Sequence, residues 1–228
     1  LASQPYLTAV GSTLYFQASN GTNGYELWKS DGSADGTVMV KDINAGAADS
    51  SPSYLAVIGS TLYFQAGDAA TGFELWRSDG SAESTVMVKD INLGATSSTP
   101  SYLAAAGSTL YFQATDGLVG SELWKSDGSA SGTVMVKDIN LGASSSSPSY
   151  LAAIGSSIYF QAGDGLVGSE LWKSDGSAES TVMVKDINLG AGSSSPSYLA
   201  AVGSTLYFQA TDGLVGSELW KSDGSASA

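Results

Sequence analysis

The sequence carries one feature above all others, an internal repeat of fixed length. The five tryptophans, which are all that the chain contains, lie at Trp28, Trp76, Trp124, Trp172 and Trp220. Each is 48 positions after the one before, within the motif Glu-Leu-Trp-Lys/Arg-Ser-Asp-Gly-Ser. Because a period of 20–50 residues is typical of solenoids, propellers and arrays, the chain must fold as repeated units rather than as one irregular core.

Each repeat contains four short segments with the composition of β-strands. In the first copy they are residues 6–10, 14–18, 25–29 and 37–43, rich in aromatic and β-branched residues and separated by Gly, Asp, Asn, Ser and Pro. This pattern predicts strands joined by tight turns. Gly11-Ser12 fits a two-residue hairpin of type II′, which needs Gly first. No helical apolar stripe occurs, so we expect an all-β fold.

Centring each hairpin on its loop predicts which side chains share a face. Both predicted faces are mostly apolar, and a row near the loop end places Glu26 opposite Lys41 as a structural ion pair. The same pair recurs at Glu74–Lys89, Glu122–Lys137 and Glu170–Lys185. One predicted face holds Leu7, Phe16, Leu27 and Val40, and the other holds Thr8, Tyr15, Trp28 and Met39.

A four-stranded sheet that is apolar on both faces must be buried between two others like it. Five such sheets around an axis satisfy this need, so we predict a five-bladed β-propeller with four-stranded antiparallel blades of 48 residues. A β-solenoid is the rival, but its coils are shorter and lack tight hairpins. The chain is then one domain, 1–228, with blades at approximately 1–48, 49–96, 97–144, 145–192 and 193–228.

The last predicted blade lacks its outermost strand. The Thr-Val-Met-Val-Lys-Asp-Ile segment occurs four times, and the fifth copy ends at Ala228 before reaching it. We expect the chain to be part of a longer protein, with Leu1 a processed or excised start. Two alternatives stay open, a strand supplied from outside and a tolerated edge. An exposed edge also invites self-association.

Composition limits the function more than it defines it. The net charge of −13 disfavours nucleic acid, and no apolar run is long enough to span a bilayer. Cys and His are both absent, which removes disulfides, thiolate metal sites and the usual general base. Because the polar groups recur in five equivalent copies, whereas enzymes need groups in differing environments, we expect no catalysis and no cofactor.

The motif Glu-Leu-Trp-x-x-Asp-Gly-Ser, followed by Gly-Thr-Val-x-Val-Lys-Asp-Ile, resembles the bacterial ELWxxDGT repeat, with Ser33 and its equivalents in place of Thr. That resemblance covers nearly the whole chain and implies a propeller-like repeat of secreted or surface-attached proteins. The blade count and length are also similar to five-bladed lectins of the tachylectin-2 type, which is a likeness of architecture only.

One rim of the propeller is the predicted place for a ligand, because loops from alternate strand ends meet there. A rim of Tyr, Gln, Asp and Glu suits a glycan, and its oxygen atoms suit calcium. The alternative is solvated loops closed by local Asx turns. The candidates are Tyr6, Tyr54, Tyr102, Tyr150, Tyr198, Gln17, Gln65, Gln113, Gln161, Gln209, Asp68, Asp116, Asp164 and Asp212.

Two other repeated features have structural interpretations that we prefer. The tryptophans could stack on sugars, but we expect them in the core between blades, with the indole N–H bonded to a neighbour. Asp31 and its equivalents could form a site, but we expect each carboxylate to accept backbone N–H bonds in its own turn. The sequence thus predicts an extracellular, non-enzymatic assembly or attachment module, and the alternative is a multivalent lectin with weak equivalent sites.

Overall fold

The computed structural model describes residues 7–225, and this part of the chain forms five antiparallel sheets with no helix. Four sheets have four strands in sequence order, and the last has three. The fold class predicted from the sequence is therefore confirmed. The strands are β1 (Leu7–Val10), β2 (Thr13–Ala18), β3 (Glu26–Ser30), β4 (Val38–Lys41), β5 (Ser53–Ile58), β6 (Thr61–Asp68), β7 (Gly72–Ser78), β8 (Val86–Lys89), β9 (Ser101–Ala106), β10 (Thr109–Ala114), β11 (Glu122–Ser126), β12 (Val134–Lys137), β13 (Ser149–Ile154), β14 (Ser157–Gly163), β15 (Ser169–Ser174), β16 (Val182–Lys185), β17 (Ser197–Val202), β18 (Thr205–Thr211) and β19 (Ser217–Ser222).

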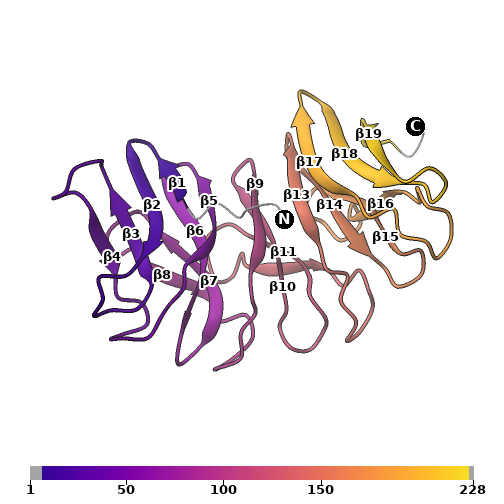
Figure 1. Cartoon of the computed structure of the whole chain (residues 1–228). Coiled ribbons are helices and arrows are strands. Elements are labelled where there is room, and N and C mark those ends of the chain that lie inside the picture. Colours follow the sequence, from indigo (N-terminus) through magenta and orange to yellow (C-terminus); the bar gives the residue numbers. More distant parts are fainter. Residues whose placement is uncertain (1–6, 226–228) are drawn as a thin grey trace.

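The blades fan out in an arc from the indigo first blade to the yellow fifth blade (Figure 1). The first strands of successive blades, β1, β5, β9, β13 and β17, contact one another in turn on the inner side of this arc. The first and last blades lie at opposite ends of it (Figure 1). Within the described residues the propeller is therefore open between blade five and blade one.

The first hairpin of each blade has the predicted register. Leu7 lies opposite Phe16, and Val10 lies opposite Thr13 across the two-residue turn. Gly11 has a φ of 59°, as a type II′ turn requires at its first central position. A residue other than Gly would be strained there.

The second hairpin has a register one residue away from the predicted one. Phe16 lies opposite Trp28 rather than Leu27, because the loop between β2 and β3 is centred on a residue instead of on a peptide bond. A slip of one residue moves every side chain of the partner strand to the other face. Tyr15 therefore shares its face with Leu27, and the predicted composition of the two faces was wrong.

Blades two, three and four nevertheless bury two apolar faces each, and blades one and five bury one each. We call the face with the Phe, Trp and Met side chains the leading face, since in blade two it carries Phe64 and Trp76 against blade one. The opposite, trailing face carries Tyr63, Leu75 and Val88 against blade three. Four such inter-blade cores, one per pair of neighbours, hold the described chain together.

Candidate functional site

The predicted site tyrosines form a row on the inner side of the blades. Ring centroids are 6.1 Å apart for Tyr54 and Tyr102, 6.1 Å for Tyr102 and Tyr150, and 5.9 Å for Tyr150 and Tyr198. The rings are tilted by 43–52°, a geometry that aromatic pairs favour. Tyr6, the remaining predicted member, lies outside the described residues.

These tyrosines also have strained backbones, which the sequence did not reveal. Their φ angles are 53–55°, in the left-handed region where a bulky side chain is rare. The strain accompanies a register irregularity in the first hairpin, between Ser53 and Ala56 in blade two. Such strain costs about 1–3 kcal/mol per residue and persists where the surroundings fix it. Here each strained tyrosine lies beside the tyrosine ring of a neighbouring blade.

The predicted glutamines lie next to this row, but the aspartates do not. Gln65 is paired with Ser53, directly before Tyr54, and its Nε2 donates to Ser53 Oγ at 3.3 Å. Asp68 lies three residues farther along the same strand, roughly 10 Å away at the usual rise per residue. The structure therefore brings together the Tyr and Gln candidates of blades two to five. The half-buried or exposed glutamines are Gln17, Gln65, Gln113, Gln161 and Gln209.

The loop aspartates are occupied by their own loops. Asp68 Oδ1 accepts hydrogen bonds from the N–H of Ala70 and Thr71, at 2.9 and 2.8 Å, and from Thr71 Oγ1 at 2.9 Å. Local bonds of the same kind close the loops at Asp116, Asp164 and Asp212. These carboxylates are Asx-turn acceptors, the structural interpretation offered from the sequence.

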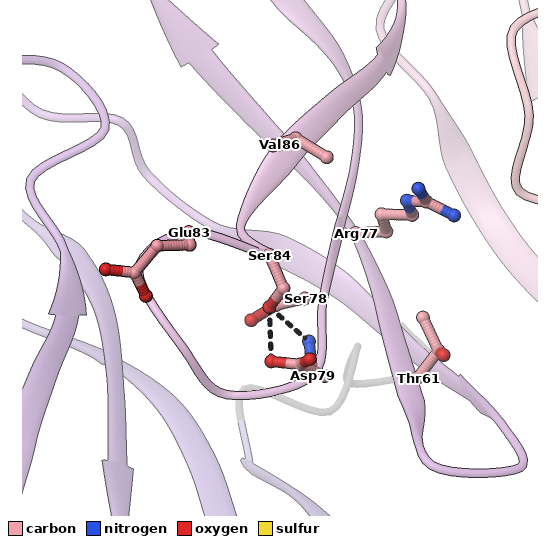
Figure 2. Close-up of a pocket in the computed structure, with 7 residues that line it drawn as sticks. All are labelled: Thr61, Arg77, Ser78, Asp79, Glu83, Ser84 and Val86. Atoms are coloured by element: carbon pink, nitrogen blue, oxygen red, sulfur yellow. Dashed lines mark hydrogen bonds between the residues drawn. The ribbon is translucent and has the colours of Figure 1, made fainter.

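The Asp-Gly turns between the third and fourth strands connect neighbouring blades. Asp31 Oδ1 accepts from Ser33 N at 2.9 Å and Ser33 Oγ at 2.7 Å, as predicted, and these bonds lower the pKa of the carboxyl. In blade two Ser84 donates its hydroxyl to Asp79 Oδ1 and accepts from Asp79 N, beside a cavity of about 380 Å³ (Figure 2). Besides the residues of this turn, the cavity is lined by Thr61, Arg77 and Val86 of the adjoining strands (Figure 2).

The turns of blades two to five are contacted by side chains of the preceding blade. Lys29 Nζ donates to Gly80 O at 2.8 Å, and a Cβ on Gly80 would lie 2.2 Å from Tyr15 Oη. Gly80 has a φ of 96°, so both its backbone and its surroundings require glycine. Burial raises the pKa of Tyr15, and the Asp79 carboxylate adds to the effect. The Asp-Gly motif is thus a joint between blades.

The glutamates of the repeated motif form a second set of connections between neighbouring blades. The ion pair predicted between Glu26 and Lys41 was wrong. Glu26 is fully buried and accepts from Ile43 N at 2.9 Å, Ser50 N at 3.0 Å and Ser50 Oγ at 2.5 Å. Lys41 does not face it, because a register shift pairs Lys41 with Leu27. Lys41 Nζ instead donates to Thr85 O of the next blade at 2.7 Å.

We call this arrangement the glutamate anchor: one buried Glu holding the Ile that follows the fourth strand and the Ser that precedes the next blade. It recurs with the same three donors at Glu74, Glu122 and Glu170. Burial raises the pKa of each of these carboxyls, and the hydrogen bonds oppose that rise. The sequence signal was available, since Ile and Ser follow each of these four Glu residues at 17 and 24 positions.

The tryptophans are core residues, as predicted, in the middle of the arc. Trp76, Trp124 and Trp172 are 5–7% exposed. The predicted bond of the indole N–H was wrong for the four complete blades, where Nε1 is buried without a hydrogen-bond partner among the described residues. In blade five, by contrast, Trp220 Nε1 donates to Ala210 O at 3.0 Å.

The two end faces of the arc are uncovered. On the leading face of blade one, Leu14 is 38% exposed, whereas its equivalent Leu62 is 0% exposed. On the trailing face of blade five, Leu219 is 79% exposed, whereas Leu123 is 0% exposed. Glu218, which occupies in β19 the position of the anchor glutamates, is also exposed. These faces are therefore the largest departure from the repeated pattern.

The loop rim of blades two to five carries exposed leucines in two rows. One row follows the fourth strands, and the other lies in the loops between second and third strands. Gly117 lies against Asn92, so the two kinds of loop are neighbours across each blade boundary. The leucines, all 78–86% exposed, are Leu93, Leu141 and Leu189 in the first row and Leu118, Leu166 and Leu214 in the second. No helix among residues 7–225 is long and apolar enough to cross a membrane.

Comparison with known proteins supports the fold. No family model matches the sequence, and no curated protein matches it. Among solved structures, the chain is similar to the computationally designed Ika8 protein, with a TM-score of 0.53 and 17% identity over 96% of this chain and 61% of that one. It is also similar to puromycin hydrolase, with a TM-score of 0.57 and 14% identity over 93% of this chain and 34% of that one.

A third similar structure is the β-propeller domain of the Trilobed protease from Pyrococcus furiosus. The TM-score is 0.54 at 10% identity, over 96% of this chain and 69% of that one. The chain spans less than two thirds of the designed protein and about a third of puromycin hydrolase. At these identities the likeness establishes the fold alone: the chain is a β-propeller.

Proposed function

We propose that this chain is a non-enzymatic, extracellular structural module that assembles side by side with further copies of itself. The observation that carries the proposal is the pair of uncovered end faces. Inside the chain a trailing face always packs on the next leading face. The two ends display one face of each kind.

The end faces have the composition of the buried faces between blades. Residues 107–130 and 203–226 are identical in sequence, so blade five presents to solvent much of what blade three buries. Leu7, at 61% exposed, and Leu219, at 79%, are large apolar side chains in water. Apolar patches of this kind mark interaction sites. A trailing face meeting a leading face of another copy is a head-to-tail contact, which builds rings or filaments.

Sedimentation velocity across a wide concentration range tests this proposal. We expect oligomers that grow with concentration, and we expect Leu219→Glu to abolish them because it places a charge in the contact. Leu93→Glu, on a rim leucine outside the end faces, is the control and should leave association unchanged. A compact monomer at every concentration would contradict the proposal.

The extracellular and attachment parts of the proposal have their own support. The motif resembles that of secreted and surface-attached repeat proteins. The exposed rim leucines offer apolar contact area on one side of the arc. Fractionation of the source cells, with immunodetection of the protein in the surface and secreted fractions, tests the location. Recovery only from the cell interior would contradict it.

Carbohydrate binding is the second candidate, and the tyrosine row favours it. Aromatic side chains on a strained backbone, regularly spaced and each with a glutamine nearby, resemble stacking subsites with a hydrogen-bonding group. A glycan array with and without calcium tests this candidate. Hits that disappear in Tyr102→Ala would support it, and a blank array in both conditions would contradict it.

A further inference from the structure

The fifth blade ends in an unpaired strand, and every feature around that strand matches a blade whose outer strand is missing. In blades one to four the third strand pairs with a fourth strand of sequence Val-Met-Val-Lys. In blade five β19 pairs only with β18 among the described residues, and it lies at the edge of the last sheet (Figure 1). Such an edge offers free backbone N–H and C=O groups to another strand.

A cavity lies where the missing strand would pack on Trp220. It has a volume of about 540 Å³ and is lined by Trp220, Leu214 and residues 185–189 of blade four. In a complete blade this place is occupied: Met87 lies opposite Trp76, and both belong to the core between blades one and two. The cavity therefore has the position of a methionine side chain from a fourth strand.

In blade five, no residue of the described chain takes the place of the Ile and Ser that donate to the other four glutamates. Glu170 and its equivalents are 0% exposed because an Ile and a Ser from the same repeat cover them and donate three hydrogen bonds. Glu218 occupies the same place in β19, opposite Ala210, but it is exposed. It is a carboxylate at the position that binds two backbone N–H groups and a hydroxyl in the other four blades.

Trp220 also differs from its equivalents in a way that fits the missing strand. Its Nε1 donates to Ala210 O, a bond that the tryptophans of the complete blades do not make. Without a neighbouring strand, the indole turns to the backbone of β18. Strand addition would cover this side chain, so Trp220 is a reporter for an occupant of the edge.

We propose that the edge of β19 is a receptor for an extended segment of another polypeptide with the pattern Val-Met-Val-Lys-Asp-Ile, followed by a Ser seven residues after the Ile. The segment would pair with β19, insert its Met beside Trp220, and donate its Ile and Ser groups to Glu218. This is strand addition with a side-chain pocket and an anchoring carboxylate. A second copy does not offer this segment freely, because its four copies are each paired within their own blades.

This proposal rests on the same open end as the proposed function, but it concerns the edge of the sheet rather than its face. It also connects the two. The trailing face of blade four includes Val184, which lies in the fourth strand, and Ile187, which follows that strand. A bound segment would supply the equivalent Val and Ile to blade five and complete its trailing face.

The test uses a synthetic peptide with the sequence of residues 180–195 and the full chain, with binding measured by calorimetry. We expect saturable binding at one site, and we expect Glu218→Ala to weaken it about tenfold or more, the effect of losing a hydrogen bond to a charged group. Because Glu218 is exposed, this variant should keep its fold. A peptide with Pro at the position of Ile187 loses one donor and should weaken binding to a similar extent.

Hydrogen exchange gives a second measurement that does not depend on a variant. We expect the peptide to protect backbone amides of β19 and to leave β3, β7, β11 and β15 unchanged, since those strands are already paired. No binding at millimolar peptide, or equal binding by a scrambled peptide or by Glu218→Ala, would overturn the proposal. Peptide binding by a chain that stays monomeric would support the receptor and contradict side-by-side assembly, and the reverse result would do the opposite.

Discussion

Blades three and five make the most informative comparison in the molecule. Their sequences are identical from Gly107 to Ala130 and from Gly203 to Ala226, yet Leu123 is 0% exposed and Leu219 is 79% exposed. Glu122 is buried and holds three donors, whereas Glu218 is exposed. Local sequence gives both blades the same hairpins. The two blades differ in whether a following blade and a fourth strand are present. The burial of these side chains is therefore determined by the neighbouring elements and not by the local sequence.

Truncating the equivalent leucines Leu123 and Leu219 should give the largest difference in stability between the two blades. We expect Leu123→Ala to lower the free energy of unfolding by about 3 kcal/mol, because it leaves a cavity between blades three and four. Leu219→Ala removes a side chain that is already in water and should change it by less than about 0.5 kcal/mol. Urea denaturation of the two variants at low protein concentration measures the difference. Equal losses would mean that blade five is covered in solution.

Replacing the anchor glutamates should have the next largest effect. Glu122→Ala leaves the N–H groups of Ile139 and Ser146 without their acceptor, and we expect a loss of about 2 kcal/mol. Glu218→Ala has no such donors to leave unpaired and should be close to neutral. Thermal unfolding of both variants checks this. A large loss in Glu218→Ala would indicate that blade five already holds an anchored segment.

The Asp-Gly turns allow a matched test of the joint between blades. Gly80 and Gly32 have φ angles of 96° and 94°, so alanine is strained at both positions. Only at Gly80 would the new methyl meet a Tyr hydroxyl, because Gly32 faces open space. We expect Gly80→Ala to cost about 1 kcal/mol more than Gly32→Ala, in line with overpacking a tight contact. Equal melting temperatures would show that the Tyr15 contact with the turn does not stabilise the fold.

We expect pH to have the smallest effect on stability among these tests, and it again separates the buried glutamates from the exposed Glu218. Burial raises the pKa of Glu26, Glu74, Glu122 and Glu170 above 4.5, so their contribution to stability is complete below pH 4.5 and is lost as the pH rises through the raised value. Hydrogen bonds lower the pKa of the turn aspartates below 3.8, so their contribution is lost as the pH falls below that value. These aspartates are Asp31, Asp79, Asp127, Asp175 and Asp223.

We therefore expect the melting temperature to be highest in mildly acidic solution and to fall toward both neutral and strongly acidic pH. Measurements at constant ionic strength check this profile. In Glu122→Ala the fall toward neutral pH should be smaller, and in Glu218→Ala it should be unchanged. A melting temperature that rises steadily to pH 7 would contradict the assignment of the buried glutamates.

The architecture could be predicted from the sequence because each of the five repeats contains the same turns and the same apolar strands that require burial. Period, turn glycines and the apolar content of both faces together specify four-stranded blades, and the missing strand could be read directly. The faces were assigned incorrectly because an apolar residue occupies almost every strand position. Exchanging Phe16 and Tyr15 between faces leaves both faces apolar, so the pattern could not decide the register.

The candidate sites were harder to predict for the same kind of reason. A Glu and a Lys at opposite strand positions suggest an ion pair, but one irregularity between Leu27 and Trp28 separates them and leaves the Glu to backbone donors. The left-handed backbone of Tyr54 has no signature in composition, since glycine is the residue expected there. Both features depend on single-residue irregularities, which an average strand pattern does not contain.

The unlike end faces give the molecule polarity. The trailing face of blade five carries Tyr207 and Leu219, whereas the leading face of blade one carries Leu7, Leu14, Phe16 and Trp28. Two copies joined by the contact that repeats inside the chain therefore meet through unlike surfaces. A polymer built through these contacts would have two different ends. A copy with a substitution that disables one of its end faces would stop growth at one end of the polymer only. Mixing copies whose leading face is disabled with copies whose trailing face is disabled should then yield dimers and no longer oligomers.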